Sequence, residues 1–259
     1  GESSNVIQFI QISSVGNATD FGDLTTTSGN GGAVGSSTRA VRGGGYSSGQ
    51  GYQEIMDYVE FSSTGNATDF GDLAGGIGNG VGSCSSSTRG IFAGGANPSL
   101  SDKIYYITIA STGNSTEFGD MHYYSDNING GMSNGTRGIH AYGGYRSGSL
   151  NRIEYITIAS TGNASDFGNA TKSAFIFGCA SNSTRGLAGN ASDIDYVTIA
   201  STGNASDFGD LATSRGDCTA VANATRCVFT GSGADDTDYV TIASTGNSTD
   251  FGNLVGEGQ

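Results

Sequence analysis

Pairs of acidic residues recur at fixed spacing in this 259-residue sequence, and they are its first candidates for chemistry. Two carboxylates lie three residues apart in four copies of one motif: Asp20/Asp23, Asp69/Asp72, Glu117/Asp120 and Asp207/Asp210. Hard cations such as calcium bind clustered carboxylates, but the alternate-residue pattern of known calcium loops is missing here. Two further copies carry Asn169 and Asn253 at the second position. Because side-chain capping of turns explains the same residues, we predict no metal and no cofactor.

Arginines form a second periodic set, each directly after a threonine: Arg39, Arg89, Arg137, Arg185 and Arg226. A ring of arginines would suit an anion, whereas pairs with acids of the same chain would stabilise the fold. We favour the structural interpretation. It predicts charge-assisted hydrogen bonds in three pairs: Arg89 with Glu117, Arg137 with Asp166, and Arg185 with Asp207.

The overall charge and the rarity of catalytic residues exclude several classes of function. The net charge of −13 opposes binding to a nucleic-acid backbone, and no apolar run approaches the roughly 20 residues of a membrane span. His122 and His140 are the only histidines, and no G-x-S-x-G motif accompanies them. We therefore expect no enzyme and no membrane insertion.

Four cysteines lack the C-x-x-C spacing of zinc sites: Cys84, Cys179, Cys218 and Cys227. We expect buried free thiols, with a Cys218–Cys227 contact across a hairpin as the alternative. Six Asn-x-Ser/Thr sequons lie in equivalent turns, where the asparagines suit a turn better than a glycan: Asn17, Asn66, Asn114, Asn163, Asn204 and Asn247.

Tyrosine-rich loops between the periodic segments are the best candidates for ligand binding. Tyr, Ser and Gly together give adaptable recognition surfaces, and tyrosine faces suit stacking on sugars while Asn, Asp and Arg bind hydroxyls. The other interpretation is that long Gly/Ser loops are merely tolerated. The predicted binding residues are Tyr46, Tyr52, Asn97, Tyr142, Tyr145, Arg146 and Asp235.

The elements that must position these residues follow from a repeat that runs through the whole chain. Six copies place an aromatic residue twelve positions before a phenylalanine, as in Tyr196 and Phe208. The count from that phenylalanine to the next repeat arginine is 18 or 19, whereas the count from the arginine to the aromatic residue that begins the next copy varies from 11 to 19. Loops vary in length and scaffolds do not, so the variable segment is the candidate functional surface.

Each complete repeat reads as four short antiparallel strands, which we name a, b, c and d in chain order. In the first repeat, strand a is 32–35 and strand b is 40–45, joined by the turn that carries Arg39. Strand c is apolar on both faces, so each sheet must be covered on both sides by neighbours. Stacked four-stranded sheets with a period of 40 to 50 residues are typical of a β-propeller. We expect one propeller domain, with a half repeat c–d at 1–24 and repeats at 25–73, 74–121, 122–170, 171–211 and 212–254.

These repeats resemble kelch repeats. The resemblance rests on the double glycine that ends strand b (Gly94-Gly95 and Gly143-Gly144), the aromatic residue of strand c and the variable b–c loop. The chain departs from common kelch repeats by carrying Phe where strand d usually has Trp. The repeat of residues 195–211 and the Ser-Ser-Thr-Arg-Gly turn also look like repeats in tail-fibre and other structural proteins of marine bacteriophages.

The resemblance implies a virion location in a tail or fibre, other virion proteins as partners and a homo-oligomer. It further implies adhesion to a cell-surface glycan or protein through the b–c loops. A purely structural scaffold without ligand is the alternative, and a glycan-cleaving enzyme is a weaker one. Five complete repeats and one half repeat leave both five- and six-bladed rings open.

Overall fold

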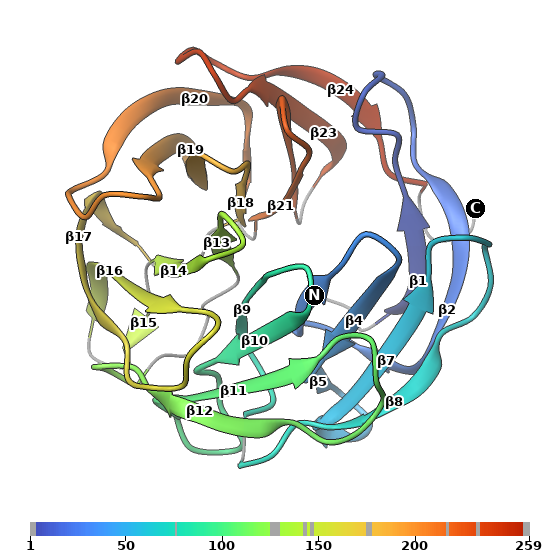
Figure 1. Ribbon diagram of the computed structural model, residues 1–259. Helices are drawn as coiled ribbons and strands as arrows, with labels where there is room; N and C mark the ends of the chain where they lie inside the picture. Colours follow the sequence, from blue (N-terminus) through green and yellow to red (C-terminus); the bar gives the residue numbers. More distant parts are fainter. Residues whose placement is uncertain are drawn as a thin grey trace.

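The chain is an all-β ring of sheets around a central axis, shown along that axis in Figure 1. The structure is a computed structural model and describes residues 4–75, 77–124, 130–141, 144–145, 148–174, 178–215, 218–231 and 234–255. Within these ranges there is no helix, and five four-stranded antiparallel blades follow one another around the ring. The predicted β-propeller is confirmed.

The first two blades follow the predicted strand order a-b-c-d. Blade 1 consists of β3 (Gly32–Gly35), β4 (Arg39–Gly43), β7 (Ile55–Glu60) and β8 (Thr68–Asp72). Its b–c loop adds a small hairpin, β5 (Tyr46–Ser47) and β6 (Gly51–Tyr52). Blade 2 consists of β9 (Gly82–Ser85), β10 (Arg89–Ala93), β11 (Lys103–Thr108) and β12 (Thr116–Asp120).

The last three blades repeat this order with different b–c connections. Blade 3 has β13 (Gly131–Ser133), β14 (Arg137–Ala141), β16 (Gly148–Thr157) and β17 (Ser165–Ala174), with β15 (Gly144–Tyr145) in its b–c loop. Blade 4 has β18 (Gly178–Ser181), β19 (Arg185–Thr198) and β20 (Ser206–Arg215). Blade 5 has β21 (Cys218–Ala222), β22 (Arg226–Gly231), β23 (Ala234–Thr241) and β24 (Thr249–Asn253).

Strand β19 supplies both b and c of blade 4. Its first part pairs with β18 and its second part with β20, and the N–H of Ile199 donates to the carbonyl of Thr184 across its two ends. The chain reverses near Ala191, whose φ of 46° is the left-handed conformation that tight turns require. This is the shortest b–c connection, as the residue counts predict.

A sixth position in the ring holds only two strands, β1 (Ser4–Phe9) and β2 (Thr19–Ser28), which correspond to c and d. They lie between blade 5 and blade 1 (Figure 1), and in the described chain β1 pairs with no strand other than β2. The half repeat therefore occupies its own place in the ring.

Six copies of one contact close the ring. The glycine of each strand d lies against the glycine of the next c–d turn, so that a Cβ on Gly119 would come within 2.3 Å of the carbonyl oxygen of Gly162. The backbone N–H of the turn glycine donates to the carbonyl of the phenylalanine in that strand d. The N–H of Gly16 in the sixth position donates to the Phe251 carbonyl of blade 5 in the same way, at 2.9 Å. The sequon asparagine of each turn accepts from the same strand, as Asn17 does from Asn253.

The apolar core lies between the blades. In the complete blades strand c is buried on both faces, as Ile104, Tyr105 and Ile107 are in blade 2. The strand c aromatic and the strand d phenylalanine pack edge to face in all six positions, with Tyr106 and Phe118 at 6.2 Å. Of the described residues, four buried clusters fill the four interfaces between complete blades, and none includes a residue of β1 or β2.

Serines connect the inner strands around the axis. Ser83 Oγ both accepts from the N–H of Ala33 and donates to its carbonyl, which joins β9 to β3. Ser133 Oγ donates to the Ser85 carbonyl and Ser181 Oγ to the Ser133 carbonyl. Small polar side chains at these positions let neighbouring strands a approach closely while their edge groups are satisfied.

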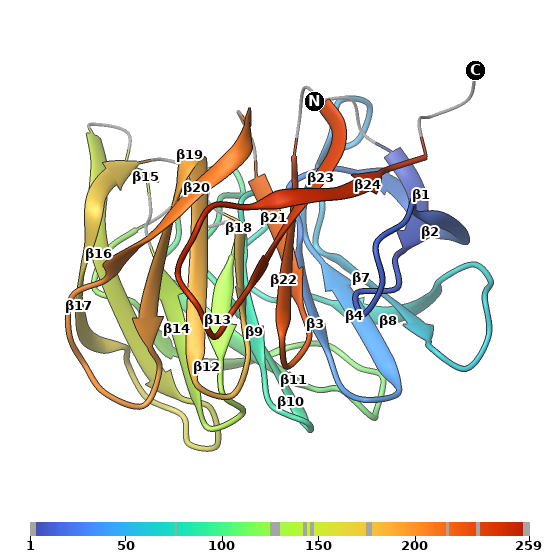
Figure 2. The same cartoon turned by 90° about the horizontal axis from the view of Figure 1, so that it is seen from above.

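The blades divide the ring into two ends. Because Arg89 at the start of β10 pairs with Thr108 at the end of β11, the a–b and c–d turns share one end. The b–c loops lie at the other end, and Figure 2 shows the two ends from the side. The uniform turns and the variable loops are therefore at opposite ends of the ring.

Candidate functional site

The b–c loop of blade 1 presents two tyrosines side by side. Tyr46 and Tyr52 are direct partners across the β5–β6 hairpin, with ring centroids 5.4 Å apart at 71°. They are 41% and 38% exposed, although a large aromatic side chain gains most from burial. Their edge-to-face packing leaves parts of both rings accessible to a ligand.

Backbone hydrogen bonds hold this hairpin in place. Tyr46 exchanges two bonds with Gly29, at 2.9 and 2.8 Å, and the N–H of Gln53 donates to the Gly45 carbonyl. The Gln53 side chain is buried and donates to the Gly51 carbonyl. The loop is thus an ordered element of the fold, which lowers the entropic cost of binding a ligand.

Polar groups lie next to the tyrosine pair. Asn97 Nδ2 donates to Glu54 Oε1 at 2.9 Å, which joins the b–c loop of blade 2 to blade 1. A Cβ on Gly78 would lie 3.2 Å from Tyr52 Cβ and 3.0 Å from the Ala96 carbonyl, so the two loops meet there. We call Tyr46, Tyr52, Glu54 and Asn97 the tyrosine surface.

The other predicted binding residues are not part of this group in the described contacts. Asp235 is exposed in β23, and its carbonyl accepts from the N–H of Leu254. Tyr145 lies in β15, where its backbone pairs with Gly148, and its side chain lies outside the described residues. Tyr142 and Arg146 also lie outside the described residues.

A second aromatic group, between blades 2 and 3, was not predicted. Tyr123 and Tyr124 follow strand d of blade 2 and are 43% and 51% exposed. The Arg152 guanidinium stacks on Tyr123 at 4.8 Å, and His122 Nδ1 lies 3.3 Å from Glu154 Oε1. Burial raises the pKa of Glu154, and the backbone N–H of His122 partly opposes this. The adjacent tyrosines beside His122 were the signal in the sequence.

The repeat arginines have other partners than the predicted acids. Arg89 stacks on Tyr106 of its own blade at 4.3 Å and donates from Nη1 to the Ile158 carbonyl of the next blade at 2.9 Å. Glu117, its predicted partner, instead lies 3.4 Å from Lys103. The same stacking and donation to a carbonyl recur at Arg39, Arg137 and Arg185. Arg226 stacks in the same way, but its Nη1 lies 3.5 Å from the Ile12 carbonyl.

The predicted pairs of Arg137 with Asp166 and of Arg185 with Asp207 are therefore corrected as well. Arg137 stacks on Tyr155 and donates to Ile199, and Arg185 stacks on Tyr196 and donates to Ile242. Arg137 pairs with Thr157 across the two strands, and its guanidinium plane lies over the ring of Tyr155, two residues earlier. The edge of the guanidinium reaches the chain at the end of strand c of the next blade. The arginines thus connect neighbouring blades.

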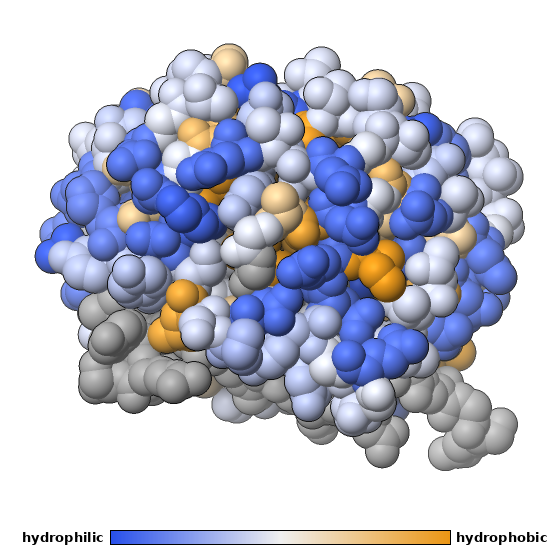
Figure 3. Space-filling view, turned by 90° about the horizontal axis from the view of Figure 1, so that it is seen from below, coloured by the Kyte–Doolittle hydropathy of each residue, from blue (hydrophilic) through white to orange (hydrophobic). Residues whose placement is uncertain are grey.

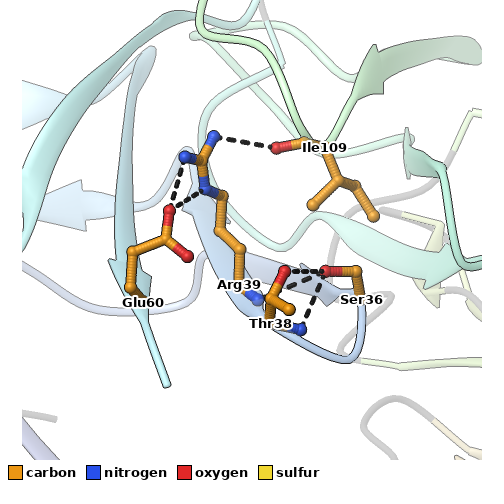
Figure 4. Close-up of polar contacts among 5 residues, drawn as sticks. All are labelled: Ser36, Thr38, Arg39, Glu60 and Ile109. Atoms are coloured by element: carbon orange, nitrogen blue, oxygen red, sulfur yellow. Dashed lines mark hydrogen bonds and ion pairs between the residues drawn. The ribbon is translucent and has the colours of Figure 1, made fainter. Parts of the chain in front are cut away.

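Figure 4 shows the polar contacts of the equivalent arginine of blade 1, Arg39. Ser36 Oγ caps the a–b turn by accepting from the backbone N–H groups of Thr38 and Arg39. Arg39 donates from Nη1 to the Ile109 carbonyl at 3.1 Å and from Nε to Glu60 at 2.7 Å. Glu60 is specific to this blade, because blades 2 to 5 carry Thr at the equivalent position.

His140 and the four cysteines are shielded from solvent. His140 is buried, and burial lowers its pKa to about 4. All four cysteines are free and buried, and burial raises the pKa of Cys84 to about 12 and that of Cys218 to about 11. Such thiols are protonated at neutral pH and so are poor nucleophiles. The described residues contain no group of three or more His, Cys, Asp or Glu that could hold a metal ion.

The side of the ring at the bottom of Figure 1 carries hydrophobic residues as small separate areas among hydrophilic ones (Figure 3). A depression of about 240 Å³ lies at the c–d turn of blade 5, lined by Tyr239, Thr241, Ser244, Thr245, Asn247 and Thr249 among others. No helix of the described chain is long and apolar enough to cross a membrane.

No known protein family matches the chain, and no match is found among curated proteins. The fold and the tyrosine surface are therefore the basis for assigning a function.

Proposed function

We propose that this chain is a recognition module without enzymatic activity, which binds a glycan through the tyrosine surface at the b–c end of the ring. The observation that carries the proposal is the exposed, ordered Tyr46–Tyr52 pair next to a carboxylate and an amide. Aromatic faces stack on the apolar faces of sugar rings, and side chains such as Glu54 and Asn97 bind hydroxyls. A protein ligand is the alternative within the same proposal.

The arrangement of the ring supports a recognition role. Turns at the a–b and c–d end are used in contacts between blades, whereas the b–c loops differ in length and sequence from blade to blade. Variable loops on a rigid scaffold are a common way to build binding sites. The kelch-like character and the resemblance to phage tail-fibre repeats suggest a virion tail or fibre as the setting, with other virion proteins as partners.

A glycan array tests the proposal directly. The unaltered chain, Tyr46→Ala and Tyr52→Ala are compared with Tyr124→Ala, which removes an equally exposed tyrosine outside the tyrosine surface. We expect a specific glycan signal that each of the first two substitutions weakens by about fivefold or more, since a stacked aromatic contributes about 1 kcal/mol or more. The control should bind as the unaltered chain does.

Two other outcomes would replace the proposal. If no surface glycan binds, a purely structural scaffold becomes the better explanation. Release of sugars from a polysaccharide by the purified chain would instead support a glycan-cleaving enzyme.

A further inference from the structure

The sixth position of the ring has an open inner edge. In each complete blade strand c pairs with b on one side and d on the other, whereas β1 pairs only with β2 in the described chain. The N–H of Ile109 donates to the Thr88 carbonyl of its own a–b turn, and blades 1, 3, 4 and 5 have the same bond. Ile12, the equivalent residue of the sixth position, follows a strand that has no such turn beside it. An unpaired strand edge is a template for another strand.

Val221 of blade 5 is exposed where every equivalent residue is buried. It is 46% exposed, against 1% to 7% for Val34, Cys84, Met132 and Ala180. Those side chains pack on the small residue that follows the repeat arginine of the next blade. A Cβ on Gly138, for example, would lie 2.5 Å from Cys84 Sγ. The next position after blade 5 is the sixth, where β1 and β2 provide no such residue.

Two phenylalanines are exposed for a related reason. Phe9 takes the place of the strand c tyrosine on which an arginine stacks, and it is 43% exposed. Phe61 of blade 1 takes the place of Ile109, Ile158, Ile199 and Ile242, whose carbonyls accept from the arginine of the preceding blade. It is 51% exposed, whereas those isoleucines are at most 1% exposed. Both phenylalanines lack the same arginine, that of the sixth position.

Arg42 adds a polar group to the same site. Its equivalents Phe92 and Phe229 face the preceding blade, since a Cβ on Gly32 would lie 3.3 Å from Phe92 Cδ1. The blade that precedes Arg42 is the sixth position, and Arg42 Nη1 is buried without a hydrogen-bond partner. Burial also lowers the pKa of Arg42, although the charge of Asp57 opposes this. A buried unsatisfied donor is costly, and a backbone carbonyl beside it would remove that cost.

We propose that the sixth position binds a β-hairpin donated by a partner polypeptide, with the chemistry of this chain's own a–b units: small residues, a Thr-Arg-Gly turn and a second short strand. Its threonine carbonyl accepts from Ile12, its arginine stacks on Phe9 and donates to the Phe61 carbonyl, and its glycine receives Val221. The existing blades specify this register, because the threonine bond and the arginine stacking occur in all five of them and the packing on the residue after the arginine recurs between neighbouring blades. This is strand addition to a sheet edge with side-chain specificity.

A hairpin from a partner fits better than a second copy of this chain. All five a–b hairpins of a second copy are already paired within their own blades. Releasing one would break a buried interface between blades in order to fill another. The proposal does not depend on the tyrosine surface, which lies on the b–c loops.

A cyclic peptide serves as the probe. The sequence of residues 178–189, with Cys179→Ser, is closed head to tail, because Gly178 and Gly189 are register partners. This hairpin has Ala188 where other blades carry Phe92 or Phe229. Phe92 of blade 2 packs against Gly32 and Gly43 of blade 1. Blade 5 has Thr219 and Thr230 at the equivalent positions, so a small residue is needed opposite their larger side chains. Cyclisation reduces the entropy that the peptide loses on binding.

The test measures peptide binding by calorimetry and the rise of the melting temperature. We expect one peptide per chain, a raised melting temperature, and binding about tenfold or more weaker for the Arg185→Ala peptide. Val221→Asp in the chain should weaken binding to a similar extent. Val15→Asp is the matched control, because Val15 is also exposed (58%) but lies in the c–d turn, where equivalent residues of complete blades stay exposed.

Three results would overturn the proposal. The first is no binding at millimolar peptide. The second is equal binding by the Arg185→Ala peptide, a comparison that uses the unaltered chain and so does not depend on the folding of a variant. The third is a dimer of the chain alone that Val221→Asp dissociates, since a second copy would then occupy the site.

Discussion

Replacing Arg137 by methionine tests how the blades are held together. Arg137 Nη1 donates to the Ile199 carbonyl at 3.0 Å, and its guanidinium stacks on Tyr155 at 4.4 Å. A charge-assisted hydrogen bond contributes about 1.5 to 3 kcal/mol and a cation–π contact about 0.5 to 2 kcal/mol. Methionine keeps much of the apolar stem, so we expect Arg137→Met to lower the free energy of unfolding by about 2 to 4 kcal/mol.

Arg226→Met provides an internal comparison. Arg226 reaches the Ile12 carbonyl of the sixth position only at 3.5 Å, beyond the usual range of an N–H···O bond, and stacks on Tyr239 at 4.6 Å. The stacking contact then accounts for most of its contribution, and we expect a loss of about 1 to 2 kcal/mol. Urea unfolding followed by circular dichroism measures both variants, with the slope checked for constancy.

Asp166→Asn distinguishes this account from the ion pair predicted from the sequence. Asp166 is exposed and has no ion pair among the described residues, so its substitution should change stability by less than about 0.5 kcal/mol. The reasoning is refuted if Asp166→Asn costs as much as Arg137→Met. It also fails if Arg137→Met costs no more than Arg226→Met.

Two further predictions concern close packing and pH. Gly119→Ala should lower the free energy of unfolding by about 3 kcal/mol or more, because the added Cβ would meet the Gly162 backbone at 2.3 Å. Gly203→Ala, whose Cβ would have nothing within 4 Å, should lower it by less than about 1 kcal/mol. Thermal melts measure both variants, and equal losses would disprove the contact. Burial lowers the pKa of His140 to about 4, so the unfolded chain binds a proton first as the pH falls through about 6.5. Stability should therefore fall by up to about 3 kcal/mol between pH 6.5 and pH 4. His140→Phe, the residue of blades 2 and 5, should remove this step in urea titrations at each pH, and an unchanged step would show that another group is responsible.

Periodicity alone was enough to predict the blades. The constant spacing from Tyr106 to Phe118 specifies a c–d hairpin, and the apolar residues on both faces of strand c require neighbours on both sides. Similarly, the constant count to each repeat arginine placed the a–b turns. These are local properties, because a strand's residue types and the length of a turn do not depend on distant parts of the chain.

The partners of the arginines could not be predicted in the same way. Charge alone makes any nearby acid a candidate for Arg89, and Glu117 lies in the right repeat. The cross-strand register instead pairs Arg89 with Thr108, which puts the guanidinium over Tyr106 and its edge beside the Ile158 carbonyl. Register and the approach of the next blade are tertiary facts. For the same reason the Glu54–Asn97 contact beside Tyr52 could not be predicted from the sequence.

The sequence by itself determined the repeated sheet, the positions of its turns and the loops that vary. Only the tertiary structure decided how many positions the ring has, because that number depends on the angle at which each c–d turn packs on the preceding strand d. Six such contacts close the circle, from Gly16 against Phe251 onwards, although only five blades have all four strands. The exposed Val221, Phe9 and Phe61 follow from that geometry, since their spacing within the repeat is the same as that of apolar and aromatic equivalents that are less exposed.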